Sequence, residues 1–368
     1  MAGSLPTRAF DKVRLELATV PTGSSFGRLF CSRYTQLALG ALSLEEARRQ
    51  ADLLPPKVRT RALNRIETMH DLLSGLPSPE ELTFNHSGLC QTSLPHRQPA
   101  SNTTVWKRQS GAFTLMIRPG VIHRKTVSQP RAKVADGEGD YVGVPFGPKA
   151  RLIMFHLQTE GLKSRTVSLG KNLSAFLRSL GLDVRGGPRG TIKPIREQAL
   201  RIGRCTFTMQ WDREDGQQTV ISDTNIVEGM DLWNPGSDDW SCEVQLSQHF
   251  HDHLRKHAVP LDKRGISLLS NNALGLDLYA LFAYRLPRLK GNLSLTWEQL
   301  QTQVGSESDA KELARRAREV LPLVLRAYPG ASIELVRQSG RAPGRLILKP
   351  SPPAVPRTTI QGFRLVGG

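Results

Sequence analysis

Hydrophobic positions recur at helical spacing in two stretches of the chain, and both stretches predict the same order of elements. In the first, an apolar run over residues 147–161 opens with Gly147 and Pro148. Proline suits a first helical position, because its missing N–H would have no partner there. A short extended segment at 166–168 and a second helical pattern at 173–180 follow. The pattern predicts a helix, a short strand and a second helix.

A third helix is predicted from about Thr191, after a glycine-rich turn at residues 185–190. An apolar stripe on this helix should pack on the first two helices; it consists of Ile192, Ile195, Ala199 and Ile202. Basic residues fall mainly on the other side of the helical wheel: Lys193, Arg201 and Arg204, with Arg196 at the edge of the stripe. Alternating residues at 207–211 and 219–221, separated by Asp215-Gly216, then predict a hairpin.

Residues 272–349 repeat this order. We predict a helix at 276–284, a strand at 293–295, a short helix at 297–304, and a third helix capped by serines and acids at 306–309. A hairpin should join 332–336 to 345–348. Pro322 should kink the third helix or end it early. Each unit resembles a winged helix.

The predicted fold class is therefore α+β, with tandem winged-helix domains and an additional N-terminal helical segment. We expect the N-terminal segment and a linker over 1–105, the two winged-helix domains over 106–240 and 241–350, and a flexible tail over 351–368. Helices at about 43–54 and 57–73 could dimerise or dock a partner, or pack on the first winged unit. Residues 77–99, rich in proline, serine and histidine, should form a surface linker.

Charge narrows the choice of partner. The chain of 368 residues has 50 Lys and Arg against 33 Asp and Glu, a formal net charge of +17, which favours a polyanion. A helix with one buried face and one basic face can enter the major groove of duplex DNA, with a hairpin beside it on the backbone. The predicted DNA-binding residues are Arg185, Arg189, Lys193, Arg196, Arg201 and Arg204 in the first unit, and Lys311, Arg315, Arg318, Arg341 and Arg345 in the second.

The sequence has few signs of a membrane span, a metal site, a nucleotide site or a catalytic site. Apolar runs are too short to span a membrane and the first residues do not resemble a signal peptide, so we expect a cytoplasmic protein without membrane contact. The cysteines at 31, 90, 205 and 242 lack metal-ligand spacing. A phosphate-binding loop is missing as well, since Gly170-Lys171 has no upstream glycine. We expect no cofactor, no bound metal and no enzymatic activity. Tryptophans 106, 233 and 240 could stack on bases, although burial is their commoner role.

The histidines raise two metal alternatives. His249-Phe-His251 matches the triplet of metal-dependent rolling-circle nucleases, with Tyr279 or Tyr284 as the nucleophile. Ser247 and the spacing of Leu246, Phe250 and Leu254 instead predict a helix, on which the two histidines diverge, and the tyrosines lie in an apolar helix. On that helix His249, His253 and His257 share a face, but no carboxylate joins them, which favours a solvated or DNA-facing role over zinc.

Motifs in order along the chain resemble the plasmid-encoded RepA replication initiator family. They lie at 141–153, 167–173, 257–262, 268–270, 273–279, 284–286, 328–329 and 348–353. The resemblance covers roughly residues 106–353 and implies an initiator that binds double-stranded origin DNA, often at direct repeats called iterons, and recruits host helicase-loading and replication proteins. It supplies no catalytic residues, so the DNA contacts above depend on the helical wheels.

The sequence therefore predicts a non-enzymatic plasmid replication initiator that binds repeated origin sequences, recruits host proteins, takes part in copy control and could form a homodimer. A winged-helix transcriptional repressor is the alternative, because the same fold can bind DNA without starting replication. The metal-dependent nuclease is the third alternative.

Overall fold

The computed structural model describes residues 44–52, 75–122, 141–169, 191–212, 219–230, 243–337 and 343–360, with isolated residues between 56 and 70 and between 174 and 184. The chain divides into two compact units, Met1–Ser74 and Gly75–Gly368. The second begins before the predicted boundary at 105, and the boundaries predicted at 240 and 350 fall inside it.

The N-terminal unit is helical where it is described. Helix α3 spans Leu44–Asp52, and the described positions among residues 56–70 are helical too. An exposed ion pair of 3.4 Å joins Arg48 to Glu67. The two helices predicted from residues 43 to 73 are confirmed over these positions.

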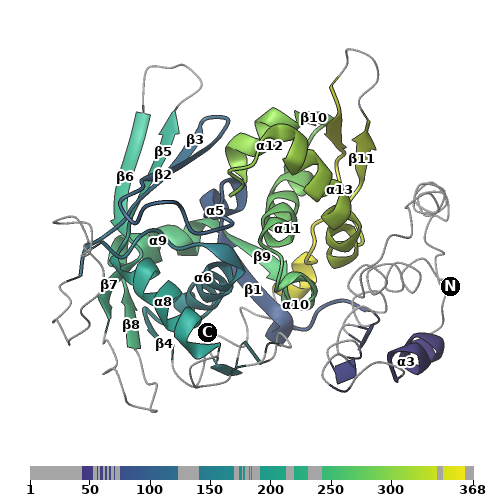
Figure 1. The fold of residues 1–368 in the computed structure, drawn as a ribbon, viewed down its shortest axis with the longest axis horizontal. Coiled ribbons are helices and arrows are strands. Elements are labelled where there is room, and N and C mark those ends of the chain that lie inside the picture. Colours follow the sequence, from purple (N-terminus) through teal and green to yellow (C-terminus); the bar gives the residue numbers. More distant parts are fainter. Residues whose placement is uncertain are drawn as a thin grey trace. The chain divides into compact units, whose positions relative to one another are not determined.

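Two helices form the centre of the larger unit, as Figure 1 shows. They are α6 (Gly147–Gly161) and α11 (Ala273–Arg285). Almost every residue of both helices is buried, which is typical of helices enclosed on all sides rather than amphipathic ones. Two antiparallel strands, β1 (Leu82–His86) and β9 (Ala258–Asp262), contact them.

The first repeat begins with α6, followed by β4 (Thr166–Ser168). Described residues between 174 and 178 are helical, and α8 (Ile192–Arg204) follows the glycine-rich segment. Strand β4 pairs with β8 (Glu243–Leu246), which pairs with β7 (Val227–Met230), so the sheet order is β4-β8-β7.

The second repeat has the same topology. Helix α11 is followed by β10 (Leu293–Thr296), α12 (Trp297–Gln303) and α13 (Ala310–Ala327). Strands β11 (Ile333–Val336) and β12 (Arg345–Leu348) complete a sheet of order β10-β12-β11. In both repeats the short strand after the first helix pairs with the last strand of a hairpin that follows the third helix.

The hairpin predicted at 207–221 exists, but its predicted place in the first repeat is wrong. Strands β5 (Thr206–Asp212) and β6 (Thr219–Asn225) pair with each other and join β2 (Trp106–Ser110) and β3 (Phe113–Arg118) in the order β2-β3-β5-β6. The hairpin that pairs with β4 is β7–β8, which comes later in the chain. A boundary at residue 240 would separate its two strands. Local alternation predicts a hairpin but does not identify the sheet that it joins.

The predicted surface linker at 77–99 is wrong. This segment forms a short 3-10 helix (Pro79–Glu81), strand β1 and helix α5 (Ser87–Gln91), and most of it is buried. Its polar side chains find partners inside: Thr83 Oγ1 lies 2.7 Å from Thr159 Oγ1, and the amide of Gln158 donates to Asn85 Oδ1 at 2.9 Å. Polar residues in a fully buried strand hide the apolar pattern that predicts strands.

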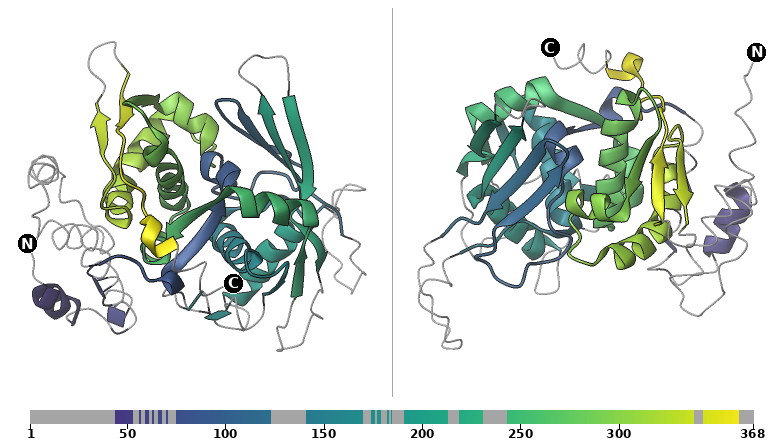
Figure 2. Two further views of the ribbon diagram at one scale, coloured as in Figure 1. Left: turned by 180° about the vertical axis from the view of Figure 1, so that it is seen from behind. Right: turned by 90° about the horizontal axis from the view of Figure 1, so that it is seen from above.

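Two further predictions need correction. Of the two alternatives for Pro322, an early end of the helix is wrong: α13 continues through Pro322 to Ala327, with Leu321 and Val324 buried on either side of the proline. The tail is packed through Ile360: Val355 is buried against Leu82 and Phe84, and a helical turn follows at 357–360. Figure 2 shows this short helix beside β1.

The connecting elements between the repeats are α9 (Gln248–His257), β9 and α10 (Lys263–Leu269), and a 3-10 turn (Leu286–Arg288) follows α11. The coarse fold class is confirmed, since the described residues form a mixed α+β structure with small antiparallel sheets. No described helix is long and apolar enough to cross a membrane.

Candidate DNA-binding surface

Helix α8 packs its predicted apolar stripe on α6 and β7, with Ile195, Ala199 and Ile202 buried. Lys193 in its first turn is exposed, and Arg196 one turn later is half-buried. The N-terminal half of α8 therefore presents basic side chains at the surface, as the helical wheel predicts.

Arg201 does not lie on the exposed face, contrary to the wheel. Its side chain is 5% exposed and forms an ion pair of 2.8 Å with Glu197 one turn earlier. It also donates to the Val144 carbonyl, and its guanidinium lies 5.0 Å from the centre of the Phe146 ring. The segment before α6 thus covers one side of α8, because Phe146 N–H also donates to Gln198. A helical wheel cannot predict that a segment distant in the sequence will cover Arg201.

Arg204 is exposed, but its guanidinium already has a partner. Nε and Nη2 both donate to the Val121 carbonyl, at 3.1 and 2.7 Å. Arg185 and Arg189 lie outside the described residues. Of the six basic residues predicted in this repeat, Lys193 and Arg196 are the described ones that lie on the outer side of the N-terminal half of α8.

Helix α13 carries the corresponding face of the second repeat. Its stripe of Leu313, Ala317, Val320 and Val324 is buried, whereas Lys311, Arg315 and Arg318 are exposed. Asp309 caps the N-terminus by accepting from Glu312 N–H at 2.7 Å. The predicted separation of an apolar from a basic face is therefore present on this helix.

Arg315 is held between two carboxylates of its own helix. It forms ion pairs of 2.6 Å with Glu312 and with Glu319. The hydrogen bond from Arg315 is the main reason why the pKa of Glu312 is lowered, and the same bond raises the pKa of Arg315. The two carboxylates thus offset much of the positive potential of Arg315. In this respect Arg315 differs from Lys311 and Arg318.

Arg345 begins strand β12 and is half-buried, opposite Thr296 of β10 and Val336 of β11. Its Nε is buried without a hydrogen-bond partner among the described residues. Arg318 lies near Trp297 of α12, with its guanidinium carbon 5.8 Å from the ring centre. Arg341 lies outside the described residues.

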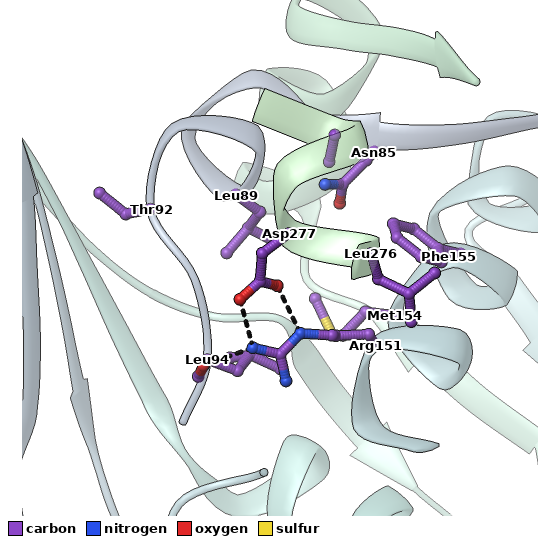
Figure 3. Close-up of a pocket in the computed structure, with 10 residues that line it drawn as sticks. Asn85, Leu89, Thr92, Leu94, Arg151, Met154, Phe155, Leu276 and Asp277 are labelled. Atoms are coloured by element: carbon purple, nitrogen blue, oxygen red, sulfur yellow. Dashed lines mark hydrogen bonds and ion pairs between the residues drawn. The ribbon is translucent and has the colours of Figure 1, made fainter. Parts of the chain in front are cut away.

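A buried ion pair joins the two repeats. The Arg151 guanidinium of α6 contacts both carboxylate oxygens of Asp277 of α11, with Nε 2.5 Å from Oδ1 and Nη2 2.9 Å from Oδ2 (Figure 3). His96 Nε2 lies 2.7 Å from Asp277 Oδ2 as well. Burial alone would raise the pKa of Asp277, but the charge of Arg151 and the hydrogen bond from His96 outweigh it and lower the pKa to about 2. The carboxylate stays ionised.

The small cavity beside this pair is lined mainly by apolar side chains, among them Leu89, Met154, Phe155 and Leu276. Its volume of about 30 Å³ leaves room for little more than water. It is therefore no candidate for a cofactor site.

His253 and His257 of α9 pack against the ring of His86 of β1. His86 Nε2 lies 2.6 Å from His253 Nδ1, and the rings of His253 and His257 have centres 4.3 Å apart. Among the described residues no cluster of three or more potential ligands could hold a metal ion. Burial and the neighbouring His253 and His257 lower the pKa of His86 to about 3. The low pKa keeps the His86 ring neutral near pH 7.

The histidines and the tyrosines of the nuclease alternative lie on helices. The prediction that His249 and His251 lie on a helix is confirmed, with Ser247 as N-cap accepting from Phe250 N–H. Tyr279 is fully buried and its hydroxyl accepts from Asp262 N–H at 2.9 Å. Trp106 is also buried and donates to the Ser93 carbonyl; the other two tryptophans of interest lie outside the described residues.

Sequence reasoning missed Arg108, Asp277 and the segment from Ser93 to His96, which together hold the two repeats in place. Asp277 had one available signal, because an acidic residue in the middle of an apolar helix needs a buried partner. The other residues lie in segments without helical or strand periodicity.

One comparison, with a family model, agrees with the predicted resemblance. Residues 144–299 match the model of a family described as plasmid encoded RepA protein. A crystal structure of RctB domains 2-3 is similar at 13% identity and a TM-score of 0.44, over 71% of this chain and 96% of that one. A crystal structure of selenomethionine derivatives of domain 2 and domain 3 of RctB gives 12% identity and a TM-score of 0.43, over 73% and 97%.

Likenesses of this size to the solved structures carry no argument about function. No match was found among the curated proteins with which the sequence was compared. The family model confirms the predicted resemblance to the plasmid-encoded RepA family over residues 144–299.

Proposed function

We propose that the protein is a plasmid replication initiator that binds repeated sequences in double-stranded origin DNA through two winged helices. The observation that carries the proposal is the duplicated topology. In each repeat, the third helix has a buried apolar stripe and basic residues on its outer side, and a hairpin follows it. The match to the plasmid-encoded RepA family supports the role in replication.

In this proposal the N-terminal half of α8 enters a major groove. Lys193 and Arg196 lie at its surface, and the basic turn with Arg185 and Arg189 precedes it in the sequence. The C-terminal half, where Arg201 is buried and Arg204 binds the Val121 carbonyl, serves to hold the helix in the protein. The helical residues between 174 and 178 would belong to the helix that crosses the DNA backbone.

Helix α13 takes the corresponding place in the second repeat. Lys311 and Arg318 are its exposed basic groups, and the charge of Arg315 is offset by its ion pair with Glu312. Arg345 at the base of the β11–β12 hairpin and Arg341 within it are proposed to contact the backbone beside the groove. Because α13 carries its own carboxylates, we propose that it contributes less affinity than α8 and its preceding turn.

Phosphate contacts should supply most of the affinity and arginines at guanine edges most of the specificity. If roughly six to ten phosphates are contacted, log affinity should fall against log salt with a slope of about 0.9 per contact. The binding experiment uses the full chain and duplexes that it selects from a random-sequence library. Affinity that does not change with salt would contradict the proposal.

A second experiment separates an initiator from a repressor. A plasmid that contains only this gene and its flanking DNA is expected to replicate in a suitable host. Failure to replicate, with DNA binding intact, would favour the transcriptional repressor. A covalent tyrosine adduct on single-stranded origin DNA with magnesium or manganese would instead support the nuclease. Recruitment of host replication proteins and homodimer formation through the N-terminal unit belong to the same proposal.

A further inference from the structure

The turn between α12 and α13 is held by residues from far earlier in the chain. The carbonyls of four consecutive residues, Gln303, Val304, Gly305 and Ser306, each accept a hydrogen bond from a residue between 93 and 108. This turn sets where α13 begins. Its position is therefore determined by the elements before the first repeat, as well as by the packing of α13 on its own repeat.

Arg108 of β2 supplies two of these bonds. Its Nε donates to the Val304 carbonyl at 2.7 Å and its Nη2 to the Ser306 carbonyl at 2.9 Å. The guanidinium lies 3.6 Å from the centre of the Trp106 ring, and Trp106 Nε1 donates to the Ser93 carbonyl at 2.8 Å. A planar guanidinium suits this bridge because its donors have fixed directions.

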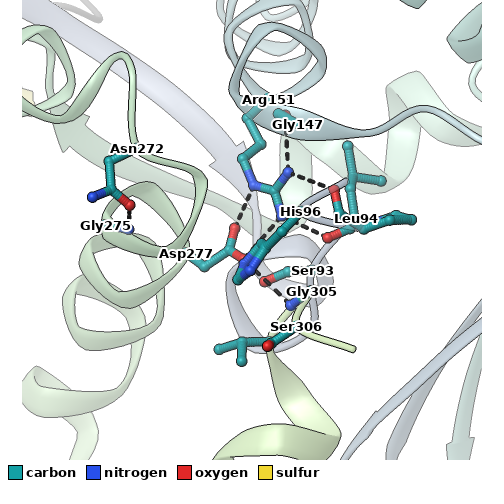
Figure 4. A network of polar contacts seen from close by, with 12 residues as sticks. Ser93, Leu94, His96, Gly147, Arg151, Asn272, Gly275, Asp277, Gly305 and Ser306 are labelled. Atoms are coloured by element: carbon teal, nitrogen blue, oxygen red, sulfur yellow. Dashed lines mark hydrogen bonds and ion pairs between the residues drawn. The ribbon is translucent and has the colours of Figure 1, made fainter. Parts of the chain in front are cut away.

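The segment Ser93–His96 supplies the other two bonds and continues to the first repeat. Ser93 N–H donates to the Gln303 carbonyl at 3.0 Å, and His96 N–H to the Gly305 carbonyl at 2.8 Å. In the other direction, the Pro95 carbonyl accepts from Gly147 N–H and from Arg151 of α6. The segment thus lies between the start of α6 and the start of α13 (Figure 4).

The contact is too close to tolerate a side chain at the turn. A Cβ added at Gly305 would lie 1.8 Å from the Leu94 carbonyl oxygen. Every N–H group of Arg151 has an acceptor here: Asp277, Pro95, Leu94 and Gly147 share them. Gly305 N–H in turn points to Asp277 Oδ2 at 3.4 Å. Arg151 is therefore fully paired at this joint, while His96 Nδ1 is buried without a hydrogen-bond partner among the described residues.

We propose that Arg108 and the segment Ser93–His96 are positioning residues that fix α13 relative to the first repeat, so that the two repeats read DNA at one set separation. The inference rests on the proposed function, because it concerns how the two repeats share a duplex. A rigid joint makes affinity depend on the separation of the two contacted DNA segments, whereas a loose joint tolerates a change in it.

The test measures tolerance of spacing. Hydroxyl-radical footprinting of a duplex selected by the wild-type chain locates the two contacted segments, and one or two base pairs are then inserted between them. The variant is Arg108→Lys, which keeps the charge but cannot span both carbonyls. Arg118→Lys on the neighbouring strand is the matched control, since Arg118 is exposed and pairs with Asp223. Trp106→Phe, which removes the Nε1–H bond to Ser93 and part of the buried ring beside Arg108, is a second variant.

One inserted base pair turns and displaces the second segment, so wild type and Arg118→Lys should lose affinity by about tenfold or more. Arg108→Lys should lose about threefold or less from the insertion, with its affinity for each segment alone changed by less than about twofold. An insertion penalty in Arg108→Lys and Trp106→Phe equal to that of wild type would overturn the inference. Wild-type binding without any insertion penalty would overturn it too, while no binding to any duplex would contradict the proposed function itself.

Discussion

Arg151 and Asp277 form a two-bonded ion pair across the joint of the two repeats, with both side chains 5% exposed. Each belongs to the first helix of its repeat, α6 or α11, so one pair of charges connects equivalent elements of a duplicated fold. Taking two charges out of water is unfavourable, and this arrangement offsets that cost because each N–H of Arg151 has an acceptor, whereas His96 Nδ1 is buried without a hydrogen-bond partner among the described residues.

Asp277→Asn should therefore destabilise the larger unit strongly. The change leaves the Arg151 guanidinium buried without its counter-charge, which typically costs about 3 to 5 kcal/mol in the free energy of unfolding. Chemical denaturation of the full chain measures it. Asp223→Asn at the exposed Arg118–Asp223 pair is the control and should cost about 1 kcal/mol or less. Equal effects of the two changes would show that the buried pair contributes no more than a surface pair.

His86 should make the stability of the protein sensitive to acid. Burial lowers the pKa of its folded form to about 3, whereas the unfolded chain has an ordinary histidine. Between these values the unfolded state binds the extra proton, so the stability is fully present above about pH 6.5 and is lost as pH falls toward 3. His86→Asn keeps an N-cap acceptor for α5 and should flatten this part of the curve of unfolding free energy against pH.

Exposed His70→Asn in the N-terminal unit is the control for that experiment, and it should leave the curve as in the wild type. A curve for His86→Asn that keeps the full wild-type slope between about pH 6.5 and 3 would mean that other groups carry the acid sensitivity.

The helices of the two repeats could be predicted from the sequence, but the contacts that join the repeats could not. Periodicity and glycine-rich turns identify α8 and α13 because an amphipathic helix is encoded within one local window. Strand β1 does not show as a strand in the sequence, because Thr83, Asn85 and His86 break the apolar pattern. Their partners Thr159, Gln158 and His253 lie far away in the sequence. The true partner of β4 was missed for the same reason, since β5 and β6 intervene. A helical wheel describes one helix alone, so it could not show that the segment with Val144 covers Arg201.

Lys193 and Arg201 are expected to behave differently when replaced. Lys193→Ala removes an exposed cation of α8, so DNA affinity should fall and the slope of log affinity against log salt should drop by about 0.9. Arg201→Ala removes a buried group bound to Glu197 and Val144, so it should lower the free energy of unfolding by about 1 to 3 kcal/mol. Fluorescence anisotropy across a salt series and denaturation measure the two effects. A change in salt slope from Arg201→Ala in folded protein would place Arg201 on the DNA and contradict the assignment.

The carboxylates around Arg315 should weaken DNA binding. In Glu312→Gln with Glu319→Gln, Arg315 loses both ion pairs of 2.6 Å and becomes available to a phosphate, and two negative charges leave the face of α13. Affinity should rise and the salt slope should steepen by about 0.9, the value for one added phosphate contact. Glu160→Gln on α6 is the matched control: it removes one half-exposed acid that pairs with Lys163, outside the helices and the hairpin proposed to contact DNA. If the double variant and this control change affinity and salt slope alike, α13 does not face the DNA, and the second repeat holds the duplex by some other surface.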